Sequence, residues 1–89
     1  MRLIILVYSD KDQKPVRGIR IRDMHPEESD QVAIDWAENI VKRVRPNGAV
    51  LAEVIECITA FEVDFHYDKV VLHGEGARRN IHQIKLGDA

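Results

Sequence analysis

The feature that most constrains the fold is a continuous apolar run over residues 2–8. In an extended segment, both alternating faces of this run are apolar: Leu3, Ile5 and Val7 on one, and Ile4, Leu6 and Tyr8 on the other. A strand that is apolar on both faces is typical of the buried middle of a sheet. The run therefore predicts a central strand that is covered on both sides.

A second strand is predicted over residues 16–23, after a polar loop over residues 9–15. Hydrophobic and basic residues alternate in it, which is the period of a strand with one buried face. We expect it to pair antiparallel with the first strand, with Ile19 and Ile21 toward the core. Arg20 and Arg22 are then expected on the outer face.

An amphipathic helix is predicted to begin within residues 24–28. Apolar residues recur every three or four positions from Val32 to Val44, which is the spacing of one helix face. A proline and two acids at positions 26–28 suit the first turn, because proline is tolerated there and the acids complement the helix dipole. Basic residues at 42, 43 and 45 suit the last turn, and Pro46-Asn47-Gly48 ends the helix.

Residues 49–60 fit two patterns. As a helix, they place five apolar residues on one face and direct Glu53 and Glu56 outward. Their β-branched residues favour a strand instead, although Glu53 interrupts its apolar face. The Ala, Leu and Glu content favours the helix, and a short second helix is the prediction.

The last third of the chain is rich in strand patterns. Alternation predicts a strand over residues 61–67, and after a tight turn a second over 70–73. Glycines at 74 and 76 interrupt the pattern, and residues 81–86 form a last, edge strand. The predicted order is ββααββ(β): an α+β fold in which helices pack on one face of an antiparallel sheet.

Length and composition set outer limits. The 89 residues are enough for one domain, spanning 1–89, with a small core that would gain from burial in a dimer or complex. The formal net charge of −2 argues against a bulk polyanion binder. One cysteine excludes an internal disulfide and suits a reducing, cytoplasmic setting. No apolar stretch approaches the length that spans a bilayer, so no membrane partner is expected.

Five arginines form the main candidate binding set. Arg17, Arg20 and Arg22 belong to the second strand, and Arg78 and Arg79 precede the last one. Arginines on one strand face suit contact with a protein partner or with phosphates. The alternative is a set of surface arginines paired with acids such as Asp23 or Glu27.

Gly74 and Gly76 form a candidate anion loop. Two glycines after a strand let successive N–H groups turn toward an anion, and Arg78 and Arg79 follow them. The string over residues 70–76 resembles the His-Gly-x-Gly segment of small MutS-related nuclease domains. That family's upstream Leu-Asp-Leu-His-Gly segment is absent, so nuclease activity is not carried over. The alternative is a connecting turn.

Asp64, His66 and Asp68 are weak candidates for a metal site, because carboxylates and imidazole at every second position of a strand can share a divalent ion. The alternation with apolar neighbours is equally explained by a solvated strand face. No motif with the spacing of a zinc site or a catalytic triad is present. We therefore predict no catalytic residues, no resident metal and no cofactor.

These observations favour a non-enzymatic protein-interaction module, acting as a small regulator, inhibitor or accessory subunit. An exposed edge strand and a small core favour a protein partner and a homodimer. The alternative is a nucleic-acid-binding protein that uses the arginine-rich strand face. The second alternative is a small metal- or phosphate-dependent enzyme.

Overall fold

The computed structural model describes residues 2–57, 62–66, 69–73 and 78–87, and of residues 62–66, 69–73 and 78 it describes the backbone alone. The elements follow in the order β1 (Arg2–Ser9), β2 (Pro15–Met24), α1 (Asp30–Arg43), β3 (Leu51–Cys57), β4 (Glu62–His66), β5 (Lys69–His73) and β6 (Arg78–Lys85).

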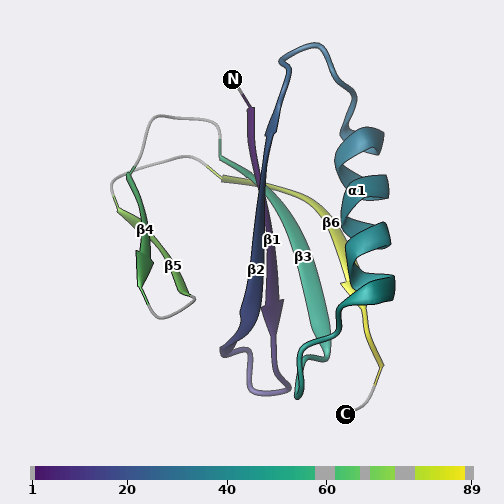
Figure 1. Cartoon of the computed structure of the whole chain (residues 1–89), viewed down its shortest axis with the longest axis vertical. Coiled ribbons are helices and arrows are strands. Elements are labelled where there is room, and N and C mark those ends of the chain that lie inside the picture. The colour runs from purple at the N-terminus through teal and green to yellow at the C-terminus, as the bar shows by residue number, and fades with distance from the viewer. Residues whose placement is uncertain (1, 58–61, 67–68, 74–77, 88–89) are drawn as a thin grey trace.

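Four strands form one antiparallel sheet in the order β2-β1-β3-β6. α1 packs on one side of this sheet, over β3 and β6 (Figure 1). β4 and β5 form a separate antiparallel pair on the other side, where β5 lies close to β2. The α+β class and the antiparallel sheet with helical packing on one face are confirmed.

β1 is a central strand, as its sequence predicts. It pairs with β2 on one edge and β3 on the other. Ile4, Leu6 and Tyr8 are buried and belong to the core beneath α1. Ile5, on the opposite face, is only 1% exposed. Because side chains alternate along a strand, β1 is covered on the helix side and, around Ile5, on the other side as well, where Leu3 and Val7 are half-buried.

α1 buries its predicted apolar stripe. Ala33, Ala37 and Ile40 are buried against the sheet. The two alanines are small and let the helix approach β3 and β6 closely. The helix begins at Asp30 instead of near Pro26, because His25–Ser29 form a turn in which the Glu28 amide donates to the His25 carbonyl oxygen at 3.0 Å. No helix in the described part of the chain is long and apolar enough to span a membrane, since α1 has 14 residues.

The predicted second helix over residues 49–60 is wrong, and within the described residues α1 is the single helix. Residues 51–57 form β3 and pair along β1 and β6. Ala52, Val54 and Glu56 lie on the helix side, where all three are buried. Glu56 interrupts the apolar pattern of this buried face, and Glu53 interrupts that of the opposite face, so the segment fitted a helix better than a strand.

The other predicted strands are confirmed, with shifts of a few residues at their ends. One prediction about β2 is wrong. Arg20 pairs with Leu6 and Arg22 pairs with Ile4, so both arginines lie on the sheet face that packs against α1. Ile21 pairs with Ile5 and lies on the opposite face. α1 covers β3 and β6 on that face, which leaves room for arginine side chains over β2.

The segment after α1 is held against the β1–β2 hairpin. The Tyr8 hydroxyl donates to the Val44 carbonyl oxygen at 3.0 Å, and the Val50 amide donates to the Ser9 carbonyl oxygen at 2.9 Å. Gly18, at φ +122°, brings the β2 backbone so close that a Cβ there would lie 2.8 Å from Pro46 Cγ. These contacts bring the end of α1 beside the start of β2.

Candidate interaction surfaces

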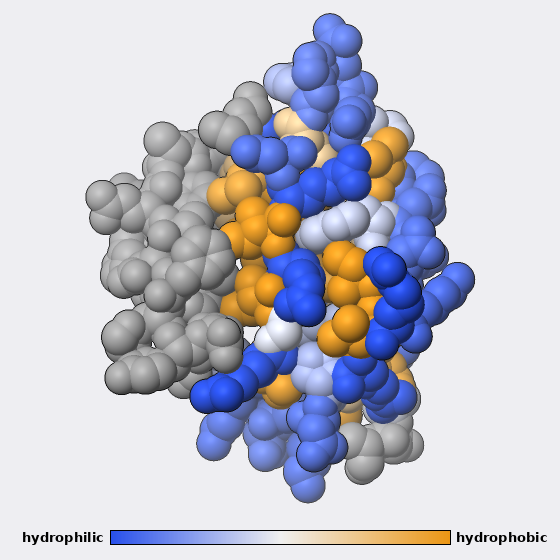
Figure 2. Space-filling model, viewed as in Figure 1, coloured by the Kyte–Doolittle hydropathy of each residue, from blue (hydrophilic) through white to orange (hydrophobic). Residues whose placement is uncertain are grey.

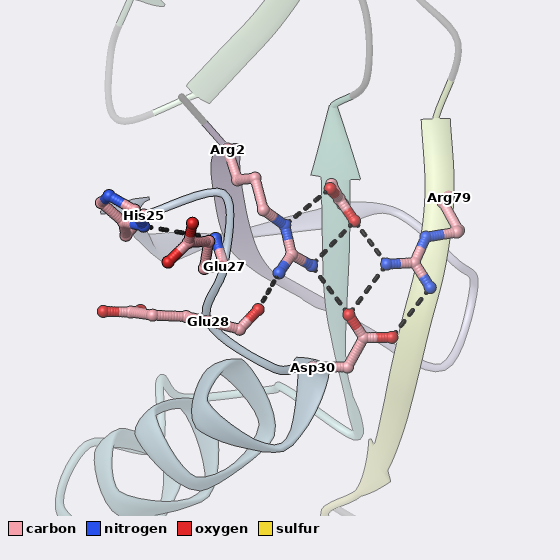
Figure 3. A network of polar contacts seen from close by, with 7 residues as sticks. Arg2, His25, Glu27, Glu28, Asp30 and Arg79 are labelled. Carbon is pink, nitrogen blue, oxygen red and sulfur yellow. Dashed lines mark hydrogen bonds and ion pairs between the residues drawn. The ribbon is translucent and has the colours of Figure 1, made fainter.

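A network of two arginines and two carboxylates joins the sheet to the start of α1 (Figure 3). Arg2 Nε donates to Glu56 Oε1 at 2.9 Å, and Arg2 Nη2 donates to Asp30 Oδ1 at 2.7 Å. Arg79 Nη1 donates to Asp30 Oδ2 at 2.8 Å, and Arg79 Nη2 donates to Glu56 Oε2 at 2.5 Å. The Glu28 carbonyl oxygen also accepts from Arg2. We call Arg2, Asp30, Glu56 and Arg79 the arginine–carboxylate network.

The local fold explains why these four groups meet. Register places Ile4 beside Glu56 and Glu56 beside Arg79, so the ends of β1, β3 and β6 lie side by side. Asp30 is the first residue of α1, which begins above them. The Arg2 and Glu56 side chains keep only 13% and 11% of their surface exposed. Charges so far from water are stable only when they are paired and hydrogen-bonded, as they are here.

The arginines stabilise the ionised carboxylates. Hydrogen bonds from Arg79 and Arg2 hold the pKa of Asp30 well below its usual range. The hydrogen bond from Arg2 lowers the pKa of Glu56, more than burial raises it. Both acids are therefore ionised at neutral pH, and the network has two positive and two negative charges. It is a balanced structural cluster without an unpaired acid or base for proton transfer.

The network predicts acid sensitivity. Because both carboxyls have lower pKa values in the folded state than the usual value of about 4, their contribution to stability is complete above about pH 5 and is lost as pH falls below about 4. Urea unfolding between pH 7 and pH 3 should show the free energy of unfolding falling at the acid end. Glu56→Gln should show a smaller fall, and equal falls in both proteins would contradict this role for Glu56.

The structure separates the five predicted arginines. Arg79 belongs to the arginine–carboxylate network, and Arg22 Nη2 lies 3.8 Å from Glu28 Oε2 near the same end of the sheet. Arg20 donates to the carbonyl oxygens of Gly18 and Ile19 on its own strand. Arg17 is exposed on β2, and Arg78 pairs with Cys57 in the β3–β6 register. Arg20, Arg22 and Arg79 share the helix-side face of the sheet but have different partners. The side chain of Arg78 lies outside the described residues, so binding by the whole set stays a prediction.

The two outer strands of the four-stranded sheet differ. β2 has β5 close beside it, a register shift opposite Leu6–Tyr8, and two carbonyl oxygens that accept from Arg20. β6 pairs with β3, and no described backbone hydrogen bond joins it to any other strand. Its register shifts between Asn80 and His82, after which His82–Lys85 pair regularly with Leu51–Val54. We call His82–Lys85 the open edge segment.

The remaining predicted sites lie mostly outside the described residues. Gly74, Gly76 and Asp68 are not described, and Asp64 and His66 are described as backbone of β4 only. The anion loop and the metal site therefore stay predictions. In the parts of the chain whose side chains are described, no group of three metal-ligating side chains occurs.

Sequence reasoning missed Arg2, Asp30 and Glu56. Arg2 follows Met1 and resembles an ordinary surface cation in the sequence, and Asp30 resembles a first-turn acid. The one local signal was Glu56, an acid at an inward position of a segment with strand-forming residues. Identifying its partners requires the long-range register of β1, β3 and β6.

Comparison with known proteins gives no match: no family model, curated protein or solved structure resembles this chain significantly.

Proposed function

We propose that this chain is a non-enzymatic protein-interaction module that binds an extended segment of a partner protein along the open edge segment. The observation that carries the proposal is the position of β6 at the end of the sheet with β3 as its one described strand partner. An edge strand presents a row of unpaired N–H and C=O groups, and an added strand satisfies them.

The contrast between the two edges supports this choice. Edge strands are commonly protected by bulges, proline, neighbouring elements or charged side chains. β2 begins with Pro15, has a register shift and lies beside β5. The open edge segment contains neither proline nor glycine, and its one lysine, Lys85, stands at its end. Its regular pairing keeps its backbone straight enough to receive about four residues of a partner strand.

The residue content of the open edge segment favours a different protein over a second copy. Two copies paired antiparallel about its centre would place Lys85 opposite His82 and Gln83 opposite Ile84. This arrangement contains no pair of opposite charges, and such pairs are among the cross-strand contacts that stabilise a sheet. A homodimer through another surface stays a prediction, tested by light scattering of the purified protein over a range of concentrations.

The test replaces one residue of the open edge segment with proline, which has no N–H and so removes one outward hydrogen-bond donor. Amide exchange first shows whether His82 or Gln83 has its N–H on the open side, since neighbouring residues of a strand point in opposite directions. Proline at that position should lower the free energy of unfolding by less than about 1 kcal/mol, because the N–H has no protein partner. Binding of a purified partner should weaken at least about tenfold, the effect of about 1.4 kcal/mol.

Partners are obtained by capture from nuclease-treated native lysate with the unmodified protein and the proline variant in parallel. A protein retained by the first and lost by the second, then confirmed by titration of the purified pair, supports the proposal. Arg22→Gln, on β2 at the opposite edge of the sheet, is the matched control and should retain the partner. Identical capture by both proteins would contradict binding along β6.

A further inference from the structure

The fold gathers basic residues that are far apart in the sequence at the end of the molecule opposite the arginine–carboxylate network. Three segments contribute to this cluster: the loop after β1, the middle of β2, and the last turn of α1 with the residues just after it (Figure 1). We call it the basic end, and its six residues are all exposed: Lys11, Lys14, Arg20, Lys42, Arg43 and Arg45.

Specific contacts place these segments together. The Tyr8 hydroxyl bonds to the Val44 carbonyl oxygen, between Arg43 and Arg45. Arg20 lies near enough to Tyr8 to lower the pKa of that hydroxyl, although burial raises it more. The close approach of Gly18 to Pro46 adds a second link between β2 and the end of α1. Figure 2 shows dark blue, strongly hydrophilic side chains over the middle and lower part of this face, with orange apolar side chains between them and a further dark blue group nearer the top.

The cations of the basic end are not neutralised by the described residues. Arg20 and Arg43 donate to backbone carbonyl oxygens, and no carboxylate in the described part of the chain pairs with any of the six. Asp10 accepts from the backbone amides of Asp12 and Lys14, which fixes the loop that carries the two lysines. The other arginines with described carboxylate partners, Arg2, Arg22 and Arg79, lie toward the opposite end.

We propose that the basic end binds the phosphate backbone of a nucleic-acid duplex. Six exposed cations on three segments match a polymer with closely spaced phosphates, and arginine also offers paired donors to phosphate oxygens. The net charge of −2 conceals this site, because most acidic residues lie in other parts of the chain. Asp10 and Asp12 share the loop with Lys11 and Lys14, so the excess positive charge comes from Arg20, Lys42, Arg43 and Arg45. This surface is distinct from the open edge segment, so it adds a ligand to the proposed protein partner.

The make-up of the basic end favours phosphates over the surface of an acidic protein. A protein interface usually has an apolar centre of several residues, whereas the basic end has one exposed large hydrophobic residue among those described, Val44 between Arg43 and Arg45, at 38%. A duplex is favoured over a single strand because the nearby aromatic ring, Tyr8, is buried and offers no platform for base stacking. Contacts confined to the backbone predict binding that is independent of base sequence.

The test is fluorescence anisotropy with labelled DNA and RNA duplexes of about 20 base pairs, titrated with the full chain at several salt concentrations. If all six cations contact phosphates, affinity should fall about a thousandfold between about 50 and about 200 mM salt. Arg43→Gln with Arg45→Gln should reduce the slope of log affinity against log salt by about two. Because both side chains are exposed, the variant should melt like the unmodified protein.

Matched single variants distinguish the basic end from net charge. Arg45→Gln and Arg22→Gln remove the same charge, and only Arg45→Gln should weaken binding, by about fivefold or more. Binding to either duplex with this pattern supports the proposal. Absence of binding at low salt, equal losses in the two variants, or equal competition by polyglutamate would overturn it. The last result would instead assign the basic end to acidic proteins.

Discussion

Replacing Glu56 with alanine is expected to lower the free energy of unfolding by about 3–5 kcal/mol, the usual cost of removing one partner from a buried ion pair. Arg2 would then keep its charge in a site where its side chain is 13% exposed, with Asp30 and a carbonyl oxygen as its remaining acceptors. Arg79 would lose its 2.5 Å contact as well. Urea unfolding at pH 7 measures the change.

Two comparisons show whether the loss of stability comes from the unpaired charge of Arg2. Glu53→Ala, on the opposite face of the same strand, removes hydrogen bonds to exposed amide side chains and should cost less than about 1 kcal/mol. Arg2→Met combined with Glu56→Leu should be less damaging than Glu56→Ala alone, because no charge is left unpaired. A cost below about 1 kcal/mol for Glu56→Ala would show that the network does not stabilise the fold.

Gly18→Ala is expected to lower the free energy of unfolding by about 2–3 kcal/mol, through backbone strain and a steric clash together. At φ +122° a residue with a Cβ is strained, and that Cβ would lie 2.8 Å from Pro46 Cγ and 3.4 Å from the Tyr8 ring. Relief of the clash requires the segment after α1 to move away from β2. The same substitution should therefore also disturb the basic end.

Gly48→Ala separates the two causes. Gly48 has φ +86°, and a Cβ at this position would have no atom within 4 Å, so the cost of the substitution is strain alone, about 1 kcal/mol. Pro46→Ala in the Gly18→Ala background removes the clashing ring atom and should restore part of the lost stability. Equal effects at Gly18 and Gly48, measured by urea unfolding, would show that the approach of β2 to Pro46 is not tight.

Local patterns were enough to predict the framework. The doubly apolar run at residues 2–8 identified the central strand, and the helical spacing from Val32 to Val44 identified the face that α1 buries. Both signals come from burial against many neighbours, so they appear directly in the residue pattern. The edge position of the last strand was also predicted, since its polar content is typical of an edge.

Long-range pairing was beyond the reach of these patterns. Glu56 fills an inward position of β3 because Arg2 and Arg79 are there to bind it, and neither lies near it in sequence. The register does place Arg20, Arg22 and Arg79 on one face of the sheet, the face that α1 packs against. Their partners could not be predicted: backbone carbonyl oxygens for Arg20, Glu28 for Arg22, and the carboxylates of the arginine–carboxylate network for Arg79.

The two proposed surfaces consist of different residues and are tested by different measurements. Binding along the open edge segment depends on backbone groups and should resist salt, whereas binding at the basic end should fall steeply with it. A nuclease-treated capture experiment therefore reports on the first surface, and the salt titration reports on the second. Arg45→Gln should affect only the second.

The proposed function requires that the outer side of β6 is open in the isolated protein. Native-state amide hydrogen exchange, followed residue by residue in dilute solution, measures this. Protection is expected to alternate over His82–Lys85: amides bonded to β3 exchange slowly, and their neighbours exchange at rates typical of solvent-facing groups. Uniform slow exchange of all four amides would contradict it, because the edge would then already be covered.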